Sequence, residues 1–261
     1  MSIIFAIILF SFLIFIHELG HFTAAKSFGV RVNEFSLFMG PAIWKKQRGD
    51  TLYAIRCIPV GGYCAMEGED GESEDPRSFA RAAWWKRLII LVAGAAMNFV
   101  AGVLLIGIFL LPDQQYVLPQ VSAVEENCAF ADSIRPGDTL VSLDGEKIYV
   151  NSDFSLLMSL NPGDVHDLTI RRDGKLISYK DLNMEQREFQ DENGNTVKRY
   201  GFSFTLGKRT FGLWAKTTWN TSMDTVRLVR LSLKMLLTGQ AGLKDMTGPV
   251  GIVQQMSSVA E

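Results

Sequence analysis

Residues 88–111 read LIILVAGAAMNFVAGVLLIGIFLL, and this stretch decides the class of the protein. Asn98 is its only strongly polar side chain. At about 1.5 Å per residue, a helix of this length can cross a hydrocarbon core of roughly 30 Å. A buried core helix of a soluble protein is the alternative, but such helices rarely run this far without a charge. We therefore predict a transmembrane helix.

The composition of the 261-residue chain fits apolar segments joined to ordinary domains. Hydrophobic residues make up 48% and charged residues 21% of the chain, and a typical soluble domain has roughly 25% charged residues. This apolar content excludes intrinsic disorder. The net charge of −2 argues against general nucleic-acid binding, so we expect no nucleic-acid partner. The three cysteines are too few for a disulfide framework.

A second apolar stretch, SIIFAIILFSFLIFI, occupies residues 2–16. A signal peptide is one interpretation, but residues 1–3 lack Lys and Arg, and no small-x-small cleavage site follows. A helix that continues to about residue 25 would instead span the membrane. Its last third would then carry the ionisable residues His17, Glu18 and His21. Ionisable groups are costly within a membrane and are therefore functional candidates.

Basic residues gather between the two apolar segments. They are Lys26, Arg31, Lys45, Lys46, Arg48, Arg56, Arg77, Arg81, Lys86 and Arg87. The N-terminal flank has no Lys or Arg, and the chain after Leu111 has none before Arg135. The positive-inside rule then predicts that residues 26–87 are cytoplasmic, and that the N-terminus and the domain after Leu111 lie outside.

The sequence His17-Glu18-Leu19-Gly20-His21 is an HExxH motif. Positions i and i+4 of a helix share a face, so His17 and His21 can bind one Zn²⁺ ion. Glu18 can then act as the general base toward a zinc-bound water, which suits peptide hydrolysis. Two unrelated histidines are the alternative, but in a membrane they would need partners. A catalytic zinc also needs a third protein ligand, and the first 111 residues offer no obvious candidate.

HExxH inside a first transmembrane helix resembles the site-2 protease family of intramembrane zinc metalloproteases, in its bacterial RseP/RasP-like branch. Further segments are similar to family motifs and follow the family order. They are 35–41 (FSLFMGP), 58–63 (IPVGGY), 85–87 (WKR) with 93–98 (AGAAMN), and 248–252 (GPVGI). Phe38 stands where the family has Gly, and Ala95 where it has Pro. The resemblance covers almost the whole chain.

The resemblance implies a third zinc ligand, the Asp of an L-D-G motif in a helix after GPVGI. No L-D-G follows Gly251 within the 261 residues. Leu143-Asp144-Gly145 has these letters, but we expect it to form a hairpin turn outside the membrane and do not assign it as a ligand. The chain is therefore similar to a C-terminally shortened protease with two of the three ligands. A complete protein without full activity is the alternative.

Two places near the motif are candidates for substrate binding. In residues 50–66, apolar residues alternate around Pro59, and Gly61-Gly62 is a turn signal, which together predict a β-hairpin. The resemblance implies that this hairpin holds the substrate as an extended strand; a plain surface hairpin is the alternative. Asn98 lies among small residues, where an amide can bond to a neighbouring helix. The resemblance instead favours a place for Asn98 in the active site, where it orients the substrate.

Residues 112–210 contain short alternating segments between turn signals, which predict a β-rich domain. Within it, 127–145 resembles a bacterial PDZ domain, although Asp132-Ser133-Ile134 replaces the usual A-G-L turn. PDZ domains bind extended peptides at a sheet edge, so a peptide or a substrate ectodomain is a possible partner. A spacer domain is the alternative. We expect His166, in the same region, to be an ordinary surface residue.

The final segment, 211–261, combines the GPVGI stretch with an amphipathic stretch at 212–238. Lys216, Asp224 and Arg227 exclude an easy membrane span there. We expect a helix at the outer membrane interface. A soluble core helix is the competing interpretation.

These features predict an α+β membrane protein of the cell inner (plasma) membrane. Region 1–111 would hold transmembrane helices at about 2–25 and 88–111, with HExxH on the first, and a cytoplasmic β-rich segment 26–87 with a membrane-associated β-hairpin. One extracytoplasmic PDZ-like domain would follow at 112–210. The lipid bilayer is an expected partner, and the active site would lie near the cytoplasmic side.

The predicted function is that of a zinc metalloendopeptidase that cleaves transmembrane segments of membrane proteins, such as an anti-sigma factor or a signal-peptide remnant. The predicted site has Glu18 as catalytic residue, His17 and His21 as Zn²⁺ ligands, and Gly61, Gly62 and Asn98 as substrate-binding residues. One alternative is a non-catalytic, membrane-anchored PDZ protein that binds membrane clients. A weaker alternative is a soluble zincin with a signal anchor, against which residues 88–111 argue.

Overall fold

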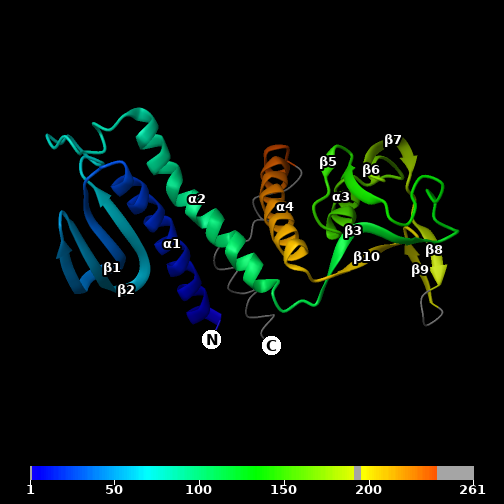
Figure 1. Ribbon diagram of the computed structural model, residues 1–261, viewed down its shortest axis with the longest axis horizontal. Coiled ribbons are helices and arrows are strands. Elements are labelled where there is room, and N and C mark those ends of the chain that lie inside the picture. Colours follow the sequence, from blue (N-terminus) through cyan, green and yellow to red (C-terminus); the bar gives the residue numbers. More distant parts are fainter. Residues whose placement is uncertain (1, 191–194, 240–261) are drawn as a thin grey trace. The chain divides into compact units, whose positions relative to one another are not determined.

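The computed structural model describes residues 2–190 and 195–239, and the chain divides into two compact units (Figure 1). The first unit takes in Met1–Leu104 and Leu236–Glu261, and the second is Leu105–Met235. Helices and sheets occur together in the chain, as the predicted α+β class requires. The GPVGI stretch at 248–252 lies outside the described residues.

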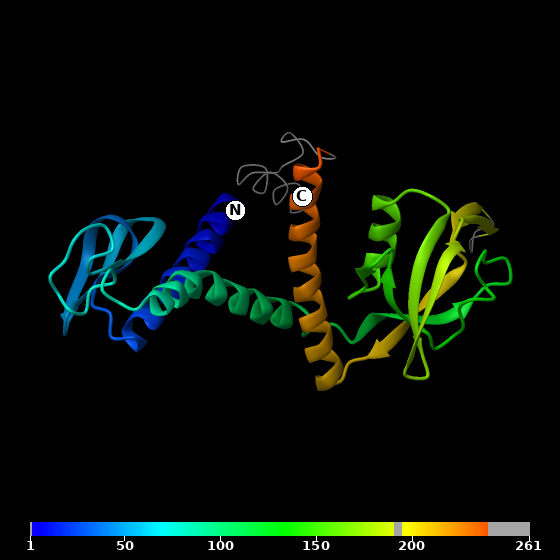
Figure 2. The same ribbon diagram turned by 90° about the horizontal axis from the view of Figure 1, so that it is seen from above.

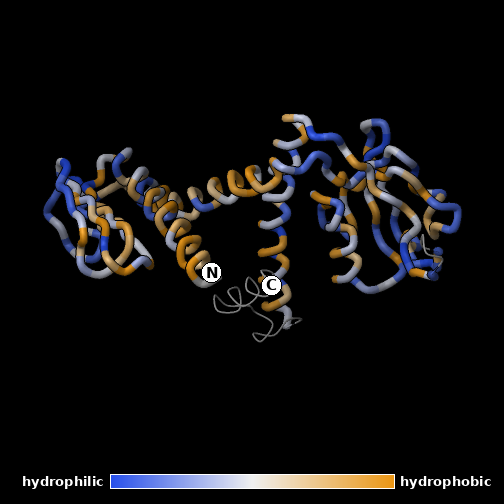
Figure 3. Tube along the Cα trace, turned by 90° about the horizontal axis from the view of Figure 1, so that it is seen from below, coloured by the Kyte–Doolittle hydropathy of each residue, from blue (hydrophilic) through white to orange (hydrophobic). Residues whose placement is uncertain are grey.

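Two long apolar helices, α1 (Ser2–Ser27) and α2 (Trp84–Phe109), confirm the two predicted helical segments within a few residues. Both are long and apolar enough to cross a membrane, and only 17% of the most apolar window of each is buried. Side chains such as Ile8 (61% exposed) and Leu104 (63% exposed) point outward, and Figure 3 shows the apolar character of both helices. Exposed apolar surface of this extent is what a lipid environment requires.

Helix α1 ends in a glycine cap. Gly29 has a φ of +75°, and the N–H of Val30 donates to the carbonyl of Ala25 at 2.9 Å. This 6→1 bond is typical of a Schellman motif, in which glycine takes the left-handed conformation without steric cost. The cap turns the chain from α1 into the hairpin that follows.

The helices α1 and α2 approach closely at Gly20. A Cβ atom at this position would lie 2.4 Å from the carbonyl oxygen of Ala93, so any side chain larger than hydrogen would push the helices apart. Small residues permit such approaches between membrane helices. Gly20 lies between the two histidines of the motif in sequence, and it thus brings their part of α1 against α2.

The β-hairpin of the first unit consists of β1 (Val32–Arg48) and β2 (Thr51–Met66), which pair antiparallel. Its turn lies at residues 49–50, with Gly49 at a φ of +60°. The prediction of a turn at Gly61-Gly62 was wrong, because both glycines lie inside β2. They are needed there for bending and close contact. Gly61 has a φ of +81°, and a Cβ at Gly62 would lie 2.9 Å from the carbonyl oxygen of Ser36.

Both hairpin strands bend, so the first half of β1 has partners on two sides. Glu34 lies opposite Leu52 and Ala65, and Leu37 lies opposite Ile55 and Gly62. Arg56 supports the bend: its guanidinium donates to the Glu34 carboxylate and to the Gly40 carbonyl, each at 2.6 Å. Figures 1 and 2 show the folded hairpin beside α1.

The second unit is β-rich, as predicted. Its strands are β3 (Gln115–Val124), β4 (Thr139–Leu143), β5 (Glu146–Lys147), β6 (Val165–Arg172), β7 (Lys175–Asn183), β8 (Arg187–Gln190), β9 (Thr196–Arg199) and β10 (Phe202–Lys208). The main sheet has the order β10-β3-β4-β6-β7, with β5 paired to β4, while β8 and β9 pair with each other. Helix α3 (Ser152–Leu160) contributes Phe154 to a buried core cluster that also contains Leu140 and Leu168.

His166 is buried in this unit, so the prediction of a surface residue was wrong. Its exposed fraction is 2%, with Nδ1 at 2.7 Å from a carboxylate oxygen of Asp144 and Nε2 at 3.0 Å from the carbonyl oxygen of Gly163. Asp144 lies in the predicted turn after β4 and also accepts from Asn161 and from the N–H of Asp167. Burial alone would raise the pKa of Asp144, but these hydrogen bonds lower it below its ordinary value.

Helix α4 (Phe211–Leu237) confirms the predicted helix and buries a polar face. Arg227 is buried and donates to the Asp153 carboxylate at 2.6 Å and to the Lys147 carbonyl at 2.7 Å. It also contacts Asp224. Because a buried charge must be paired, these bonds hold α4 against the sheet and α3. Its apolar side chains on the other side stay exposed, among them Val226 and Val229.

Candidate metal centre on the HExxH helix

The imidazoles of His17 and His21 converge on one point of α2. A Cβ atom built at Gly94 would lie 2.6 Å from Nε2 of His17 and 2.6 Å from Nε2 of His21. The two ring centroids are 4.8 Å apart. Both Nε2 atoms therefore face a common space that exists only because residue 94 has no side chain.

The backbone of α2 fixes the protonation of His21. Its Nδ1 lies 2.8 Å from the carbonyl oxygen of Ile90. A carbonyl oxygen can only accept, so Nδ1 carries the hydrogen and Nε2 keeps a lone pair in neutral imidazole. Nε2 is the ring nitrogen that faces the space at Gly94. A carbonyl that orients a histidine in this way is the usual outer partner of a metal-binding imidazole.

Asn98 stands beside the other histidine. Its amide nitrogen lies 3.3 Å from Nδ1 of His17, and its Oδ1 is buried without a hydrogen-bond partner among the described residues. If the amide oxygen faced Nδ1 instead, Nδ1 would donate to it and Nε2 would be free to bind a metal. The orientation of this one amide therefore selects the tautomer of His17.

Glu18 faces the hairpin rather than α2. Its Cγ lies 3.8 Å from the position of a Cβ at Gly62. A Cβ atom at Gly61 would lie 3.2 Å from the side chain of Met39. Of the predicted site residues, the structure thus brings His17, His21 and Asn98 together on one side and sets Gly62 beside Glu18.

An apolar cavity of about 250 Å³ opens between α1 and the hairpin. Its lining includes Phe12 and Phe15 of α1 together with Leu37, Phe38 and Pro59. The hydroxyl of Ser11 donates to the Pro59 carbonyl at 2.8 Å and ties β2 to the helix at this level. An apolar side chain of a bound segment would fit this space.

The donor set fits zinc in part. Two imidazole Nε2 atoms that share an open space, with a carboxylate one residue along, match the chemistry that zinc prefers. Within residues 2–190 and 195–239, no group of three His, Cys, Asp or Glu side chains could hold a metal. Asp144, which has the L-D-G letters, is held by His166 in the second unit. A third ligand would have to come from outside the described residues.

Apart from Asn98, sequence reasoning missed the part that α2 contributes. Gly94 and the Ile90 carbonyl shape the histidine pair, yet glycine has no functional group and a backbone carbonyl leaves no trace in the sequence. The one available signal was the run of small residues at 93–96 in a helix that must pack on the HExxH helix.

Residues 5–261 match Peptidase family M50. The chain belongs to this family, the site-2 proteases. The finding confirms the resemblance and the membrane-embedded zinc metalloprotease class.

Several relatives align over nearly the whole chain. A protein of Clostridium acetobutylicum, named provisionally as a zinc metalloprotease, is 34% identical over 99% of this chain and 75% of its own length. A Clostridium perfringens protein with the same kind of name is also 34% identical, over 100% of this chain and 76% of its own. The regulator of sigma-W protease RasP of Bacillus subtilis is 25% identical over 100% of this chain and 80% of its own.

Among solved structures, the PDZ domain of an SdrC-like protein from Listeria monocytogenes matches 34% of this chain and 90% of that domain. The identity is 19% and the TM-score is 0.27.

Proposed function

We propose that this chain is an intramembrane zinc metalloendopeptidase that cleaves the transmembrane segments of membrane proteins. The observation that supports the proposal is the space at Gly94 of α2, which Nε2 of His17 and Nε2 of His21, both on α1, share. Both helices are long and apolar enough to lie in a membrane. Imidazoles in such a setting need a partner, and a metal ion supplies one.

In this proposal, each side chain of the motif has one role. His17 and His21 bind the ion through Nε2, and Asn98 and the Ile90 carbonyl hold the rings through Nδ1. Zinc, when bound, supplies a Lewis acid and makes a coordinated water acidic enough to react near neutral pH. Glu18 accepts the proton of the attacking water and then delivers it to the leaving amine.

The substrate would bind along β2 as an added strand. Residues 62–66 pair with 32–37 on one edge, and the described register gives their other edge no partner. Gly62 lies beside Glu18, so a peptide on this edge would run close to the general base. Strand addition would also hold a transmembrane helix in the unwound form that a protease needs. Asn98 and the apolar cavity would orient the same segment.

The β-rich region 112–210 would act as a PDZ-like domain that binds an extended peptide or a substrate ectodomain. Supporting this, β10 is an edge strand of the main sheet, and Phe154 of α3 packs 5.0 Å from the ring of Phe202. A sheet edge beside a helix is the setting in which PDZ domains add a peptide strand.

The proposed topology sets the protein in the inner membrane with residues 26–87 in the cytoplasm and the PDZ-like domain outside. The basic residues between α1 and α2 support it. The name of RasP, a regulator of sigma-W protease, supports an anti-sigma factor as the substrate class, with a signal-peptide remnant as the second candidate.

The test combines zinc content with cleavage of a single-span membrane substrate by the reconstituted full chain. We expect His17→Ala and His21→Ala to lose both bound zinc and cleavage, and Glu18→Gln to keep zinc but lose cleavage. His166→Ala is the matched control and should keep both. Full cleavage by Glu18→Gln would refute the mechanism. A zinc-free wild type that captures the substrate without cutting it would favour the non-catalytic PDZ protein.

A further inference from the structure

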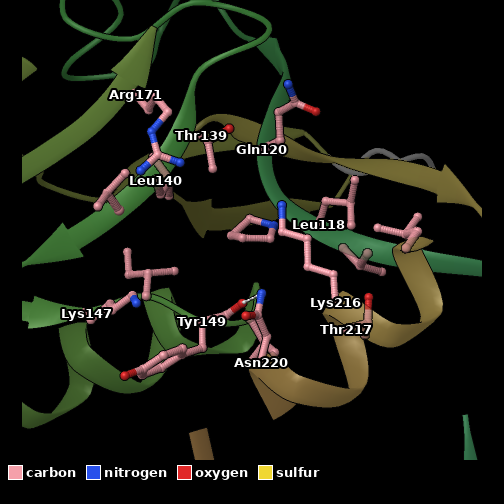
Figure 4. Close-up of a pocket in the computed structure, with 16 residues that line it drawn as sticks. Leu118, Gln120, Thr139, Leu140, Lys147, Tyr149, Arg171, Lys216, Thr217 and Asn220 are labelled. Carbon is pink, nitrogen blue, oxygen red and sulfur yellow. Dashed lines mark hydrogen bonds between the residues drawn. The ribbon is translucent and has the colours of Figure 1, made fainter. Parts of the chain in front are cut away.

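A cavity of about 260 Å³ lies in the second unit, away from the HExxH motif in sequence (Figure 4). Strands β3 and β4, the segment after β5 and the first turns of α4 all line it. A water molecule takes up roughly 30 Å³ of liquid volume, so this space can hold an anion of several heavy atoms. The feature that distinguishes the cavity is the charge of its lining.

Three cationic side chains from three different elements line the cavity. Lys147 ends β5, Arg171 lies in β6 and Lys216 lies in α4 (Figure 4). No Asp or Glu belongs to the lining. Within the described part of the chain, none of these three cations forms an ion pair. The cavity therefore has a positive charge that no ion pair among the described residues neutralises.

The nearby acids are already engaged with other cations. Glu146, next to Lys147 in the chain, pairs with Arg230 of α4. Asp138, next to Thr139 of the lining, pairs with Arg172 at 2.7 Å. Glu146 and Asp138 could therefore neutralise the cations of the cavity only by giving up their ion pairs with Arg230 and Arg172. All three cations are exposed, and an anionic ligand in the cavity would pair with them at once.

The rest of the lining is held in place and divides into a polar and an apolar part. The amide of Asn220 donates to the Tyr149 carbonyl at 3.2 Å, which fixes α4 to the segment after β5. Thr139 and Thr217 add hydroxyl groups that can donate to an anion, whereas Leu118 and Leu213 form an apolar wall. Such a lining suits an anion that carries several oxygen atoms and, optionally, an apolar group.

We propose that this cavity binds a phosphate-bearing anion through Lys147, Arg171 and Lys216. The ligand can be free phosphate or the headgroup of an anionic phospholipid, because both present charged non-bridging phosphate oxygens to the cations. Guanidinium and ammonium groups on several sides match the tetrahedral phosphate group, whose oxygens point in different directions, better than a planar carboxylate. The proposal is independent of the proteolytic function.

The experiment is titration calorimetry on the full chain in a non-ionic detergent at constant ionic strength. The probes are inorganic phosphate, dihexanoyl phosphatidylglycerol, dihexanoyl phosphatidylcholine and acetate. Wild type is compared with Arg171→Gln/Lys216→Gln. The control is Lys175→Gln/Lys180→Gln, which removes the same charge from exposed positions of β7 outside the cavity. Circular dichroism and thermal melting check that all variants fold.

We expect phosphate, phosphatidylglycerol or both to bind wild type and the control with equal affinity, and at least about tenfold more weakly to Arg171→Gln/Lys216→Gln, since charge-assisted hydrogen bonds are lost. Binding of phosphatidylglycerol alone identifies a lipid site, and binding of phosphate alone a site for the free anion. The proposal fails if neither binds, if both double variants lose affinity equally, or if acetate or phosphatidylcholine binds as well as the phosphate probes.

Discussion

The chain contains two kinds of histidine site, and the difference lies in what the second ring nitrogen meets. In the second unit, both nitrogens of His166 face protein acceptors, the Asp144 carboxylate and the Gly163 carbonyl. In the first unit, Nδ1 of His21 is bonded to the Ile90 carbonyl, and its Nε2, which has no hydrogen bond within the described part of the chain, faces the space at Gly94 that it shares with Nε2 of His17. A fully bonded imidazole stabilises a fold, whereas one with a free nitrogen is prepared for a ligand.

The largest effect should come from filling the shared space. Gly94→Ala would put a methyl group 2.6 Å from both Nε2 atoms, so we expect zinc binding and cleavage to be abolished. Zinc content of the purified protein, measured by atomic absorption, checks this. Gly102→Ala is the control on the same helix, because nothing lies within 4 Å of its Cβ position. If Gly94→Ala keeps its zinc, the two Nε2 atoms are not the metal donors.

A smaller effect should follow from removing the partner of His17. Asn98→Ala takes away the amide that lies 3.3 Å from Nδ1, and losses of outer partners typically lower metal affinity about 10–100-fold. Asn98→Asp should recover the affinity, because its carboxylate accepts from Nδ1. Competition with a zinc chelator measures both variants. Equal affinity of Asn98→Ala and wild type would leave Asn98 as a packing residue between helices.

His166 should show the opposite behaviour. His166→Ala leaves the partly buried Asp144 carboxylate without one of its donors, and we expect the free energy of unfolding to fall by about 1–3 kcal/mol with zinc content unchanged. His166→Asn keeps an N–H donor near the position of Nδ1 and should recover part of the loss. Urea titration followed by circular dichroism gives these values. A loss of zinc in His166→Ala would contradict the division between the two kinds of histidine.

The smallest effect is a dependence of stability on pH in the second unit. Burial would raise the pKa of Asp138, but hydrogen bonds from Arg172 and from the N–H of Arg135 lower it, and the pKa of Asp144 is lowered too. These groups therefore stabilise the fold above the ordinary carboxyl pKa of about 3.9, and the contribution is lost as pH falls through their lower folded values.

Unfolding by urea at several pH values from 7 to 2 measures that dependence. Asp138→Asn should be less stable at pH 7 and should show a weaker decline of stability below pH 4. An unchanged slope in this variant would mean that other carboxyl groups account for the decline.

The sequence allowed the prediction of features that depend on local pattern. Apolar runs located α1 and α2, the i, i+4 spacing paired His17 with His21, and turn signals placed Asp144 in a turn. Prediction from the sequence failed where a residue's role depends on a segment far away in the chain. Gly61-Gly62 has the letters of a turn, yet these glycines serve contacts with Met39 and Ser36 across the hairpin.

The errors at the two histidine sites have the same origin. Nothing next to His166 in the sequence indicates that Asp144 will lie beside it in the folded sheet. The role of the Ile90 carbonyl could not be predicted from the sequence either, because every residue has a backbone carbonyl. Only the packing of α1 on α2 makes that carbonyl a partner of His21.

The way in which the β-rich domain joins its helices has a consequence for its evolution and engineering. Gln115 and Lys208 are paired neighbours at its two ends, the N–H of Arg209 donates to the Gln114 carbonyl at 3.0 Å, and Trp214 of α4 donates to the Gly107 carbonyl of α2 at 2.9 Å. The chain therefore leaves the domain where it entered. A domain whose two ends lie side by side can be removed or replaced by another domain through one short linker. The contact between the end of α2 and the start of α4 would then be kept.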